Sequence, residues 1–282
     1  MHTNAWHSGN ESTNLLKGPF MKSLTHSQLA TSERFLRLED SDGDFPFYNG
    51  APVFISSLQW LFVITMVVVA FLVLAASSHL PSGMLWQFIP AFALPVLPLM
   101  ALAIVAPTHW KAIFGKVGGR ELKLMLAFAL LNIIVSMSIG GAVKVLTEVT
   151  PNGSTAQLGN LGSAERIAFF AKTIPQLLGE EIITLLPFLA LLYWFTKSFG
   201  AGRKLAIVGA WILTSLVFGL IHLPTYHWNW IQCIVVIGSA RLMLTLPWVM
   251  TKNIWVSTGA HIINDWALFG MTLLGAGLVG KV

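Results

Sequence analysis

Residues 53–77 read VFISSLQWLFVITMVVVAFLVLAAS and contain no acidic, basic or histidine side chain. An α-helix needs about 20 predominantly apolar residues to cross the hydrocarbon core of a bilayer, because each residue advances it by about 1.5 Å. Inside a bilayer the backbone N–H and C=O groups must be paired within the chain, and a helix pairs them within one segment. The stretch therefore predicts a membrane-spanning α-helix.

Six further runs of the same kind follow along the chain. They lie at 85–106, 124–146, 177–196, 204–222, 230–250 and 254–279. The stretch 164–176 is helical in pattern but too polar to span alone, so it forms either an interfacial helix or the start of a long helix kinked at Pro175. We therefore expect an all-α fold, a polytopic transmembrane helical bundle of about seven to eight spans.

The overall composition agrees with a membrane protein. Of the 282 residues, 55% are hydrophobic and 10% are charged, and the mean hydropathy is +0.71, which is outside the range of soluble domains. The net charge of +5 does not indicate a nucleic-acid partner, because Lys and Arg lie mainly in short loops between the apolar runs, where they set topology. The single cysteine, Cys233, excludes an internal disulfide.

The loop charges predict an orientation in the membrane. Lys and Arg follow the second, fourth and sixth runs, whereas the loops at 78–84 and 223–229 contain neither. Under the positive-inside rule this alternation places the N-terminus in the cytoplasm. The short loops suit a bacterial cytoplasmic (inner) membrane, and we expect an integral, multi-pass protein there.

The first fifty residues differ from the rest of the chain. Residues 1–50 are polar and include the acidic run Glu39-Asp40-Ser41-Asp42-Gly43-Asp44. They contain too few apolar side chains to form a core of their own, so we expect a mobile N-terminal tail. The transmembrane domain then occupies residues 51–282.

Six ionisable side chains fall inside the predicted spans. A charged residue at the centre of a span costs about 2.5–3.5 kcal/mol on insertion scales, so such residues usually face the bundle interior and carry function. All of them lie in the last four spans: Glu180, Glu181, His222, Arg241, His261 and Asp265. Together they could supply a general base, polarising groups and an orienting group for hydrolysis, and a transporter would use the same groups as a proton or ion path.

The spacing of the acidic residues separates their expected roles. Glu180 and Glu181 are adjacent, and neighbouring helical side chains point about 100° apart, so one can reach a reaction centre while the other contacts a neighbouring helix. His261 and Asp265 are four residues apart and share a helix face, so the carboxylate can orient the imidazole. Each pair also has a purely structural interpretation, as polar contacts between helices or near the membrane interface.

Two other histidines have different surroundings. His222 ends the run FGLIH at 218–222, in which Phe218 lies one turn earlier on the same face, where it can support the site or a bound substrate. A lone histidine on an apolar helix is more often a hydrogen-bonded core residue, so His222 gains significance only from the other motifs. His227 lies in the aromatic segment 226–230, and we assign it to the membrane interface.

The motifs Glu180-Glu181, Phe218-x-x-x-His222 and His261-x-x-x-Asp265 together resemble those of the CAAX protease and bacteriocin-processing (CPBP, Abi) family, which includes the type II CAAX prenyl endopeptidases. The resemblance covers about residues 120–280, with the motifs in the family's order and on separate helices. It implies an intramembrane protease that hydrolyses a peptide bond in a membrane-associated peptide or protein, prenylated or bacteriocin-type. The alternative is a non-catalytic member that acts as a bacteriocin immunity factor or a regulatory membrane scaffold.

The resemblance also implies a role for each motif residue. Glu180 would activate the water with Glu181 beside it, and His222 and His261 would be the histidines of the site. Asp265 stands where the family has Asn or Asp, and would polarise or orient the centre. The cofactor stays open, because two histidines and a glutamate fit a zinc site, with His222 and His261 as ligands, as well as a metal-free, glutamate-activated water.

One position departs from the family pattern. The first motif commonly continues as Glu-Glu-x-x-x-Arg, and this chain has Leu185 in place of the arginine. Arg241, near the middle of the sixth run, could supply the missing positive charge. An unpaired guanidinium would be costly there, so we expect it to face the bundle interior, to pair with Glu180, Glu181 or Asp265, and to support the site or its substrate.

The predicted spans do not place the motif residues at one depth. In straight helices with these boundaries, Glu180 and His222 lie near the outer ends of their spans, whereas His261 lies about 10 Å from the inner end of its own. We nevertheless expect Glu180, His222 and His261 to converge in one cavity, because proline kinks can change the depth of a residue.

Overall fold

The fold is all-α, as predicted. The computed structural model describes residues 33–81, 83, 85–152 and 158–279, and these contain seven α-helices and no β-strand. The helices are α1 (Ser57–Ala75), α2 (Phe88–Val105), α3 (Gly119–Leu146), α5 (Ser163–Lys197), α6 (Arg203–Ile221), α7 (Gly238–Thr251) and α8 (Ile254–Val279). Short 3-10 helices η1 (Ala76–His79) and η2 (Trp110–Ile113) follow α1 and α2, and a π-helical turn η3 (Gln232–Ile237) leads into α7.

Every predicted span is helical in the structure. Among the described residues, α1, α2, α3, α5, α6 and the joined η3–α7 are six helices long and apolar enough to cross a membrane. The seventh predicted run forms α8, a helix of 26 residues. The stretch 164–176 is not a separate interfacial helix. It is the first part of α5, which has 35 residues and continues through Pro175 and Pro187.

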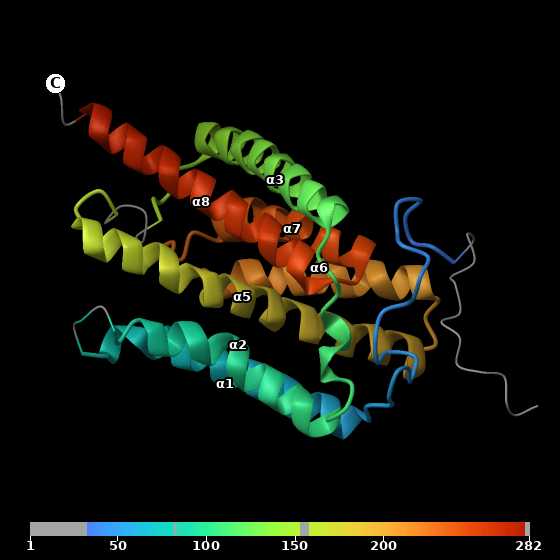
Figure 1. Ribbon diagram of the computed structural model, residues 1–282. Coiled ribbons are helices and arrows are strands. Elements are labelled where there is room, and N and C mark those ends of the chain that lie inside the picture. The colour runs from blue at the N-terminus through green and yellow to red at the C-terminus, as the bar shows by residue number, and fades with distance from the viewer. Residues whose placement is uncertain (1–32, 82, 84, 153–157, 280–282) are drawn as a thin grey trace, which may run out of the picture.

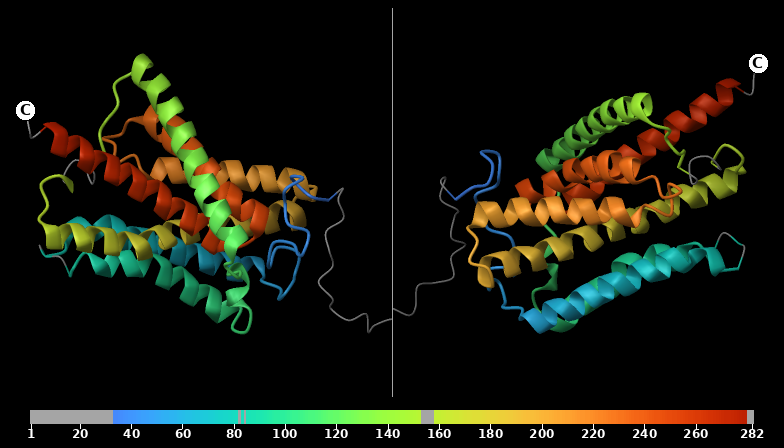
Figure 2. Two further views of the ribbon diagram at one scale, coloured as in Figure 1. Left: turned by 45° about the horizontal axis from the view of Figure 1, so that its top comes forward. Right: turned by 180° about the vertical axis from the view of Figure 1, so that it is seen from behind.

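The long helix α5 lies at the centre of the bundle. The α1–α2 pair packs on one side of it, and the layer of α3, α6, α7 and α8 lies on the other (Figures 1 and 2). Most side chains of the second half of α5 are buried, and its Ile182, Leu186, Phe188 and Leu189 belong to the main apolar core. A residue on this helix can therefore face either layer without contacting lipid.

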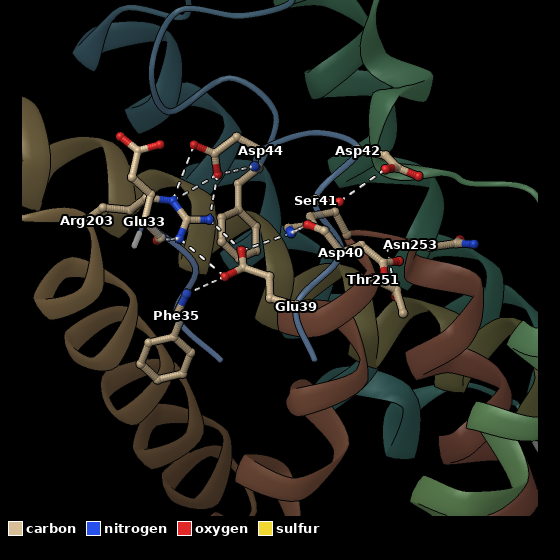
Figure 3. Close-up of polar contacts among 12 residues, drawn as sticks. Glu33, Phe35, Glu39, Asp40, Ser41, Asp42, Asp44, Arg203, Thr251 and Asn253 are labelled. Atoms are coloured by element: carbon tan, nitrogen blue, oxygen red, sulfur yellow. Dashed lines mark hydrogen bonds and ion pairs between the residues drawn. The ribbon is translucent and has the colours of Figure 1, made fainter. Parts of the chain in front are cut away.

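Residues 33–50, which we call the N-terminal segment, cross one end of the bundle (blue in Figure 1). Phe45 is buried against Phe188 and Trp248. The buried carboxylate of Glu39 is bound by Arg203 (Figure 3) and by Lys252 at 2.9 Å. The described part of the expected mobile tail is thus docked on the bundle, because aromatic burial and paired charges hold it. Residues 1–32 lie outside the described residues.

The basic residues that follow α2, α5 and α7 gather at the same end of the bundle. Arg120 donates two hydrogen bonds to Asp40, Arg203 pairs with Glu39 and Asp44, and Lys252 donates to the backbone carbonyl of Asp40. All three basic residues therefore contact the N-terminal segment. This end, which we call the basic end, has the loop arrangement that the alternation of charges predicts.

Candidate active site

The glutamate pair lies midway along the central helix. Glu180 and Glu181 are in the middle of α5, because this helix begins at Ser163 and not near the predicted span boundary at 177. The expected difference in depth between Glu180 and His261 was therefore wrong, and its cause was the boundary. The polar stretch 164–176 continues the helix, so the glutamates reach the level of the motif on α8.

Glu181 forms a buried ion pair with Arg241 of α7. The guanidinium donates two hydrogen bonds to the carboxylate, of 2.7 and 2.8 Å, and the two side chains are only 2% and 1% exposed. Arg241 also donates through Nε to Thr245 Oγ1 at 3.0 Å and lies over the Phe218 ring. The expectation that Arg241 faces the interior and pairs with an acid is confirmed, and Glu181 is the partner. Leu185 lies in the apolar core.

His261 lies between the two glutamates and Asp265. Its Nδ1 is 2.8 Å from Glu181 Oε1, and its Nε2 is 3.9 Å from Glu180 Oε2 and 3.7 Å from Asp265 Oδ1. A carboxylate held by a guanidinium can only accept hydrogen bonds. Nδ1 of His261 therefore carries a proton and donates a hydrogen bond to Glu181. The distances from Nε2 exceed direct hydrogen-bond range, so this nitrogen can serve a group placed between the carboxylates.

The two glutamates diverge, as their adjacent positions on a helix predicted. Glu181 connects α5 to α7 and α8, whereas Glu180 accepts a hydrogen bond from Gln176 of its own helix at 3.1 Å. The Glu180 side chain is 13% exposed, against 2% for Glu181. Of the pair, Glu180 is therefore the carboxylate that water can reach.

His222 lies at the edge of this group. It caps the C-terminal end of α6, and its Nδ1 donates to the backbone carbonyl of Phe218 at 2.7 Å, which leaves Nε2 free to accept when the ring is neutral. No hydrogen bond or ion pair joins His222 to Glu180 or His261 among the described residues, so the expected convergence of these three side chains stays a prediction. His227 is exposed and takes no part in the group.

The structure thus brings four side chains together, which we call the site cluster: Glu180, Glu181, His261 and Asp265. Two of its supporting residues were missed by a search for ionisable groups alone. Gln176 lies one turn before Glu180 and binds it, and Asn264 donates to Asp265 Oδ1 at 2.9 Å. Both are amides on the same helices as the residues that they contact, and their spacing from the motif acids was the available signal.

The side chains do not form a zinc site as arranged. Among the described residues, no group of three or more His, Cys, Asp or Glu side chains is placed to hold a metal ion. Zinc ligands lie about 2.0–2.3 Å from the metal and converge on one point. Nδ1 of His261 is bound to Glu181 and Nδ1 of His222 is bound to a backbone carbonyl, so Nε2 is the ring nitrogen that each histidine has left for a ligand.

The bundle contains an apolar groove. It has a volume of about 630 Å³ and runs between α2, α3, α5 and α8, where its walls include Phe92, Met125, Leu178 and Ile262. Leu178 is two residues before Glu180, and Ile262 follows His261 directly. The groove and the site cluster therefore share two helices, α5 and α8, but no lining residue.

Comparison with known proteins agrees with the motif assignment. Residues 163–267 match the family model described as Type II CAAX prenyl endopeptidase Rce1-like. The matched range runs from the start of α5 into α8 and contains the whole site cluster, together with His222 and Arg241. No curated protein and no solved structure matches the chain. The resemblance to CAAX proteases that the three motifs indicated is thus confirmed.

Proposed function

We propose, from the match to CAAX prenyl endopeptidases, that this integral membrane protein is an intramembrane endopeptidase with Glu180 as its general base. The observation that carries the proposal is the partly exposed Glu180 carboxylate beside His261, whose other ring nitrogen is fixed by the buried Glu181–Arg241 pair. A passive bundle has little reason to bury four ionisable groups in contact at its centre.

The chemistry follows from the positions of these groups. Glu180 takes a proton from a water molecule, and the water oxygen attacks the carbonyl carbon of the scissile peptide bond. Glu180 then returns the proton to the leaving amine as the C–N bond breaks. When its Nε2 also carries a proton, His261 can donate a hydrogen bond from the side of Glu180 and Asp265 to the carbonyl oxygen and polarise it. A positioned general base such as Glu180 contributes about 10²- to 10⁴-fold in rate.

Arg241 takes over the task of the motif arginine that Leu185 replaces. Its guanidinium comes from α7 and holds the Glu181 carboxylate by two hydrogen bonds. Glu181 in turn fixes the tautomer and the ring orientation of His261. The departure from the family pattern is therefore offset by a residue from another helix.

The substrate is expected to be a membrane-associated peptide or protein, prenylated or bacteriocin-type. The groove between α2, α3, α5 and α8 is lined almost wholly by apolar side chains, which suits a substrate that arrives within the bilayer. We further propose that the basic end faces the cytoplasm of a bacterial cell and that residues 51–282 form the protease domain.

The proposal is tested by comparing peptide fragments in membranes of cells that express the wild type or Glu180→Gln. Glu165→Gln is the matched control, because Glu165 is an exposed carboxylate in the first turn of the same helix. Fragments present with the wild type and the control but lost with Glu180→Gln support the proposal and identify the substrate. Fragment sets that do not depend on Glu180 would instead favour the non-catalytic immunity or scaffold role.

A further inference from the structure

Two buried amides connect α3 to the site cluster. Asn132, in the middle of α3, is 1% exposed, and its Nδ2 donates to Asn264 Oδ1 at 3.0 Å. Asn264 is 4% exposed, and its Nδ2 donates to Asp265 Oδ1 at 2.9 Å. Burying an amide in an apolar span is unfavourable unless it is hydrogen-bonded, so this chain of bonds accounts for both side chains.

The chain of hydrogen bonds has a direction. An amide group has a donor end and an acceptor end, and the carboxylate of Asp265 can only accept when it is ionised. Because Asn132 donates to the oxygen of Asn264, the nitrogen of Asn264 is the end that faces Asp265. Without a donor at position 132, Asn264 loses the hydrogen bond that fixes its oxygen, and its amide group is held less firmly against the carboxylate.

We propose that Asn132 is a positioning residue for the reaction: acting through Asn264, it orients the Asp265 carboxylate toward His261. The inference rests on the proposed function, and it extends the active site to α3, which lies outside the residues matched by the family model. Asp265 Oδ1, the atom that Asn264 binds, is also the atom 3.7 Å from His261 Nε2. A change in the orientation of Asn264 therefore acts on the contact nearest the reaction centre.

The test uses Asn132→Asp, which has almost the same shape and, in its ionised form, offers only acceptors. The ionised carboxylate at position 132 then competes with Asp265 for the amide nitrogen of Asn264, which weakens the bond that orients Asp265. We expect kcat for a synthetic peptide that spans a Glu180-dependent cleavage site to fall about 10- to 100-fold, as for other residues that orient a catalytic group, with KM little changed. Ser138→Ala is the control on the same helix, because the exposed Ser138 hydroxyl bonds only to the backbone of Ile134, and it should keep the wild-type rate.

A second-site change separates positioning from a structural role. In an Asp265→Asn background, residue 265 can donate to or accept from Asn264, so adding Asn132→Asp should cost little further activity. A merely structural role for Asn132 predicts the same loss of kcat per folded molecule in both backgrounds, or a loss of folded protein with unchanged kcat, and either result overturns the inference. If Asn132→Asp does not yield folded protein, Asn132→Ala takes its place. It should lower kcat in the wild-type background and cost little further activity in the Asp265→Asn background.

The same series distinguishes the two proposals. If Glu180→Gln cleaves the peptide like the wild type, the proposed function fails and the inference fails with it. If Glu180→Gln is inactive while Asn132→Asp and Asn132→Ala both keep the wild-type kcat, the protease assignment stands and only the role of Asn132 is refuted.

Discussion

Replacing Arg241 with methionine removes the positive charge from the most buried ion pair in the site. Methionine keeps an apolar chain of similar length but leaves the Glu181 carboxylate without its counter-charge. Arg241 and Glu181 are 1% and 2% exposed, so bulk water cannot take over the role of the guanidinium. Breaking a buried pair in this way costs about 3–5 kcal/mol. At about 1.4 kcal/mol per factor of ten, the folded-to-unfolded ratio should fall by about 10²- to 10⁴-fold.

The chain provides a matched control at the basic end. Arg120 also donates two hydrogen bonds to one carboxylate, that of Asp40, but these side chains are 55% and 28% exposed. Exposed ion pairs contribute about 0–1 kcal/mol, so Arg120→Gln should change the unfolding free energy by no more than that. The comparison isolates burial, because the hydrogen-bond pattern is the same in both pairs.

The assay is reversible unfolding of the purified protein in mixed micelles, together with peptide cleavage. The double variant Arg241→Met/Glu181→Gln should recover most of the stability, because no uncompensated charge remains and the glutamine oxygen can still accept from His261 Nδ1. Cleavage should not recover, because the negative charge that orients His261 is lost. The reasoning is refuted if Arg241→Met unfolds within about 1 kcal/mol of the wild type, as expected for Arg120→Gln.

Three further predictions follow from other parts of the structure. Burial alone would raise the pKa of Glu39, but hydrogen bonds from Arg203, Lys252 and the Phe35 backbone outweigh it and hold the pKa below its ordinary value. The stability that Glu39 contributes is therefore present above its unfolded pKa of about 4.3 and is lost as the pH falls through its lower folded pKa. Measuring the unfolding free energy at decreasing pH should show this loss in the wild type and not in Glu39→Gln. His261→Ala should abolish cleavage while His227→Ala is tolerated, and an equally inactive His227→Ala would show that the exposed histidine was wrongly assigned. A chelator separates the two mechanisms: cleavage that is lost and then restored by zinc indicates a metal site, and unchanged cleavage indicates a glutamate-activated water.

Most of the fold could be predicted because lipid allows few solutions for a polar backbone. Long apolar runs must be helices, and each of them is one. For residues 164–176 the sequence left two alternatives, because Arg166 and Lys172 interrupt the apolar pattern, and the structure selects the start of a long helix. In the structure their charges are accommodated by tertiary partners, the Gly159 carbonyl and the Gln87 side chain, which hydropathy does not reveal.

The docking of the N-terminal segment also could not be predicted from the sequence. Composition correctly indicates that residues 33–50 cannot form a core of their own. It does not show that Glu39 meets Arg203, 164 residues away, or that Phe45 packs on Trp248. Contacts of this length depend on the assembled bundle, which provides the surface that the segment lacks.

For the site, the motifs indicated the residue types, and the structure added their pairing. Glu180, Glu181, His261 and Asp265 were all identified as candidates, but three acids were equally eligible as partners of Arg241, and only the geometry selects Glu181. Asn132 was missed because the search considered ionisable groups alone. An amide in an apolar span has to find a partner too, and that requirement was readable from the sequence.

The most direct measurement of the central claim is turnover of one cleavable peptide by purified wild-type protein and Glu180→Gln at equal folded concentration, with Glu165→Gln as the control. Glu180→Gln replaces one oxygen of the carboxylate that water can reach with an amide nitrogen. If Glu180 activates the water, kcat falls by about 10²- to 10⁴-fold in Glu180→Gln with little change in KM, and the control keeps the wild-type rate. Equal kcat values for the wild type and Glu180→Gln would contradict the account.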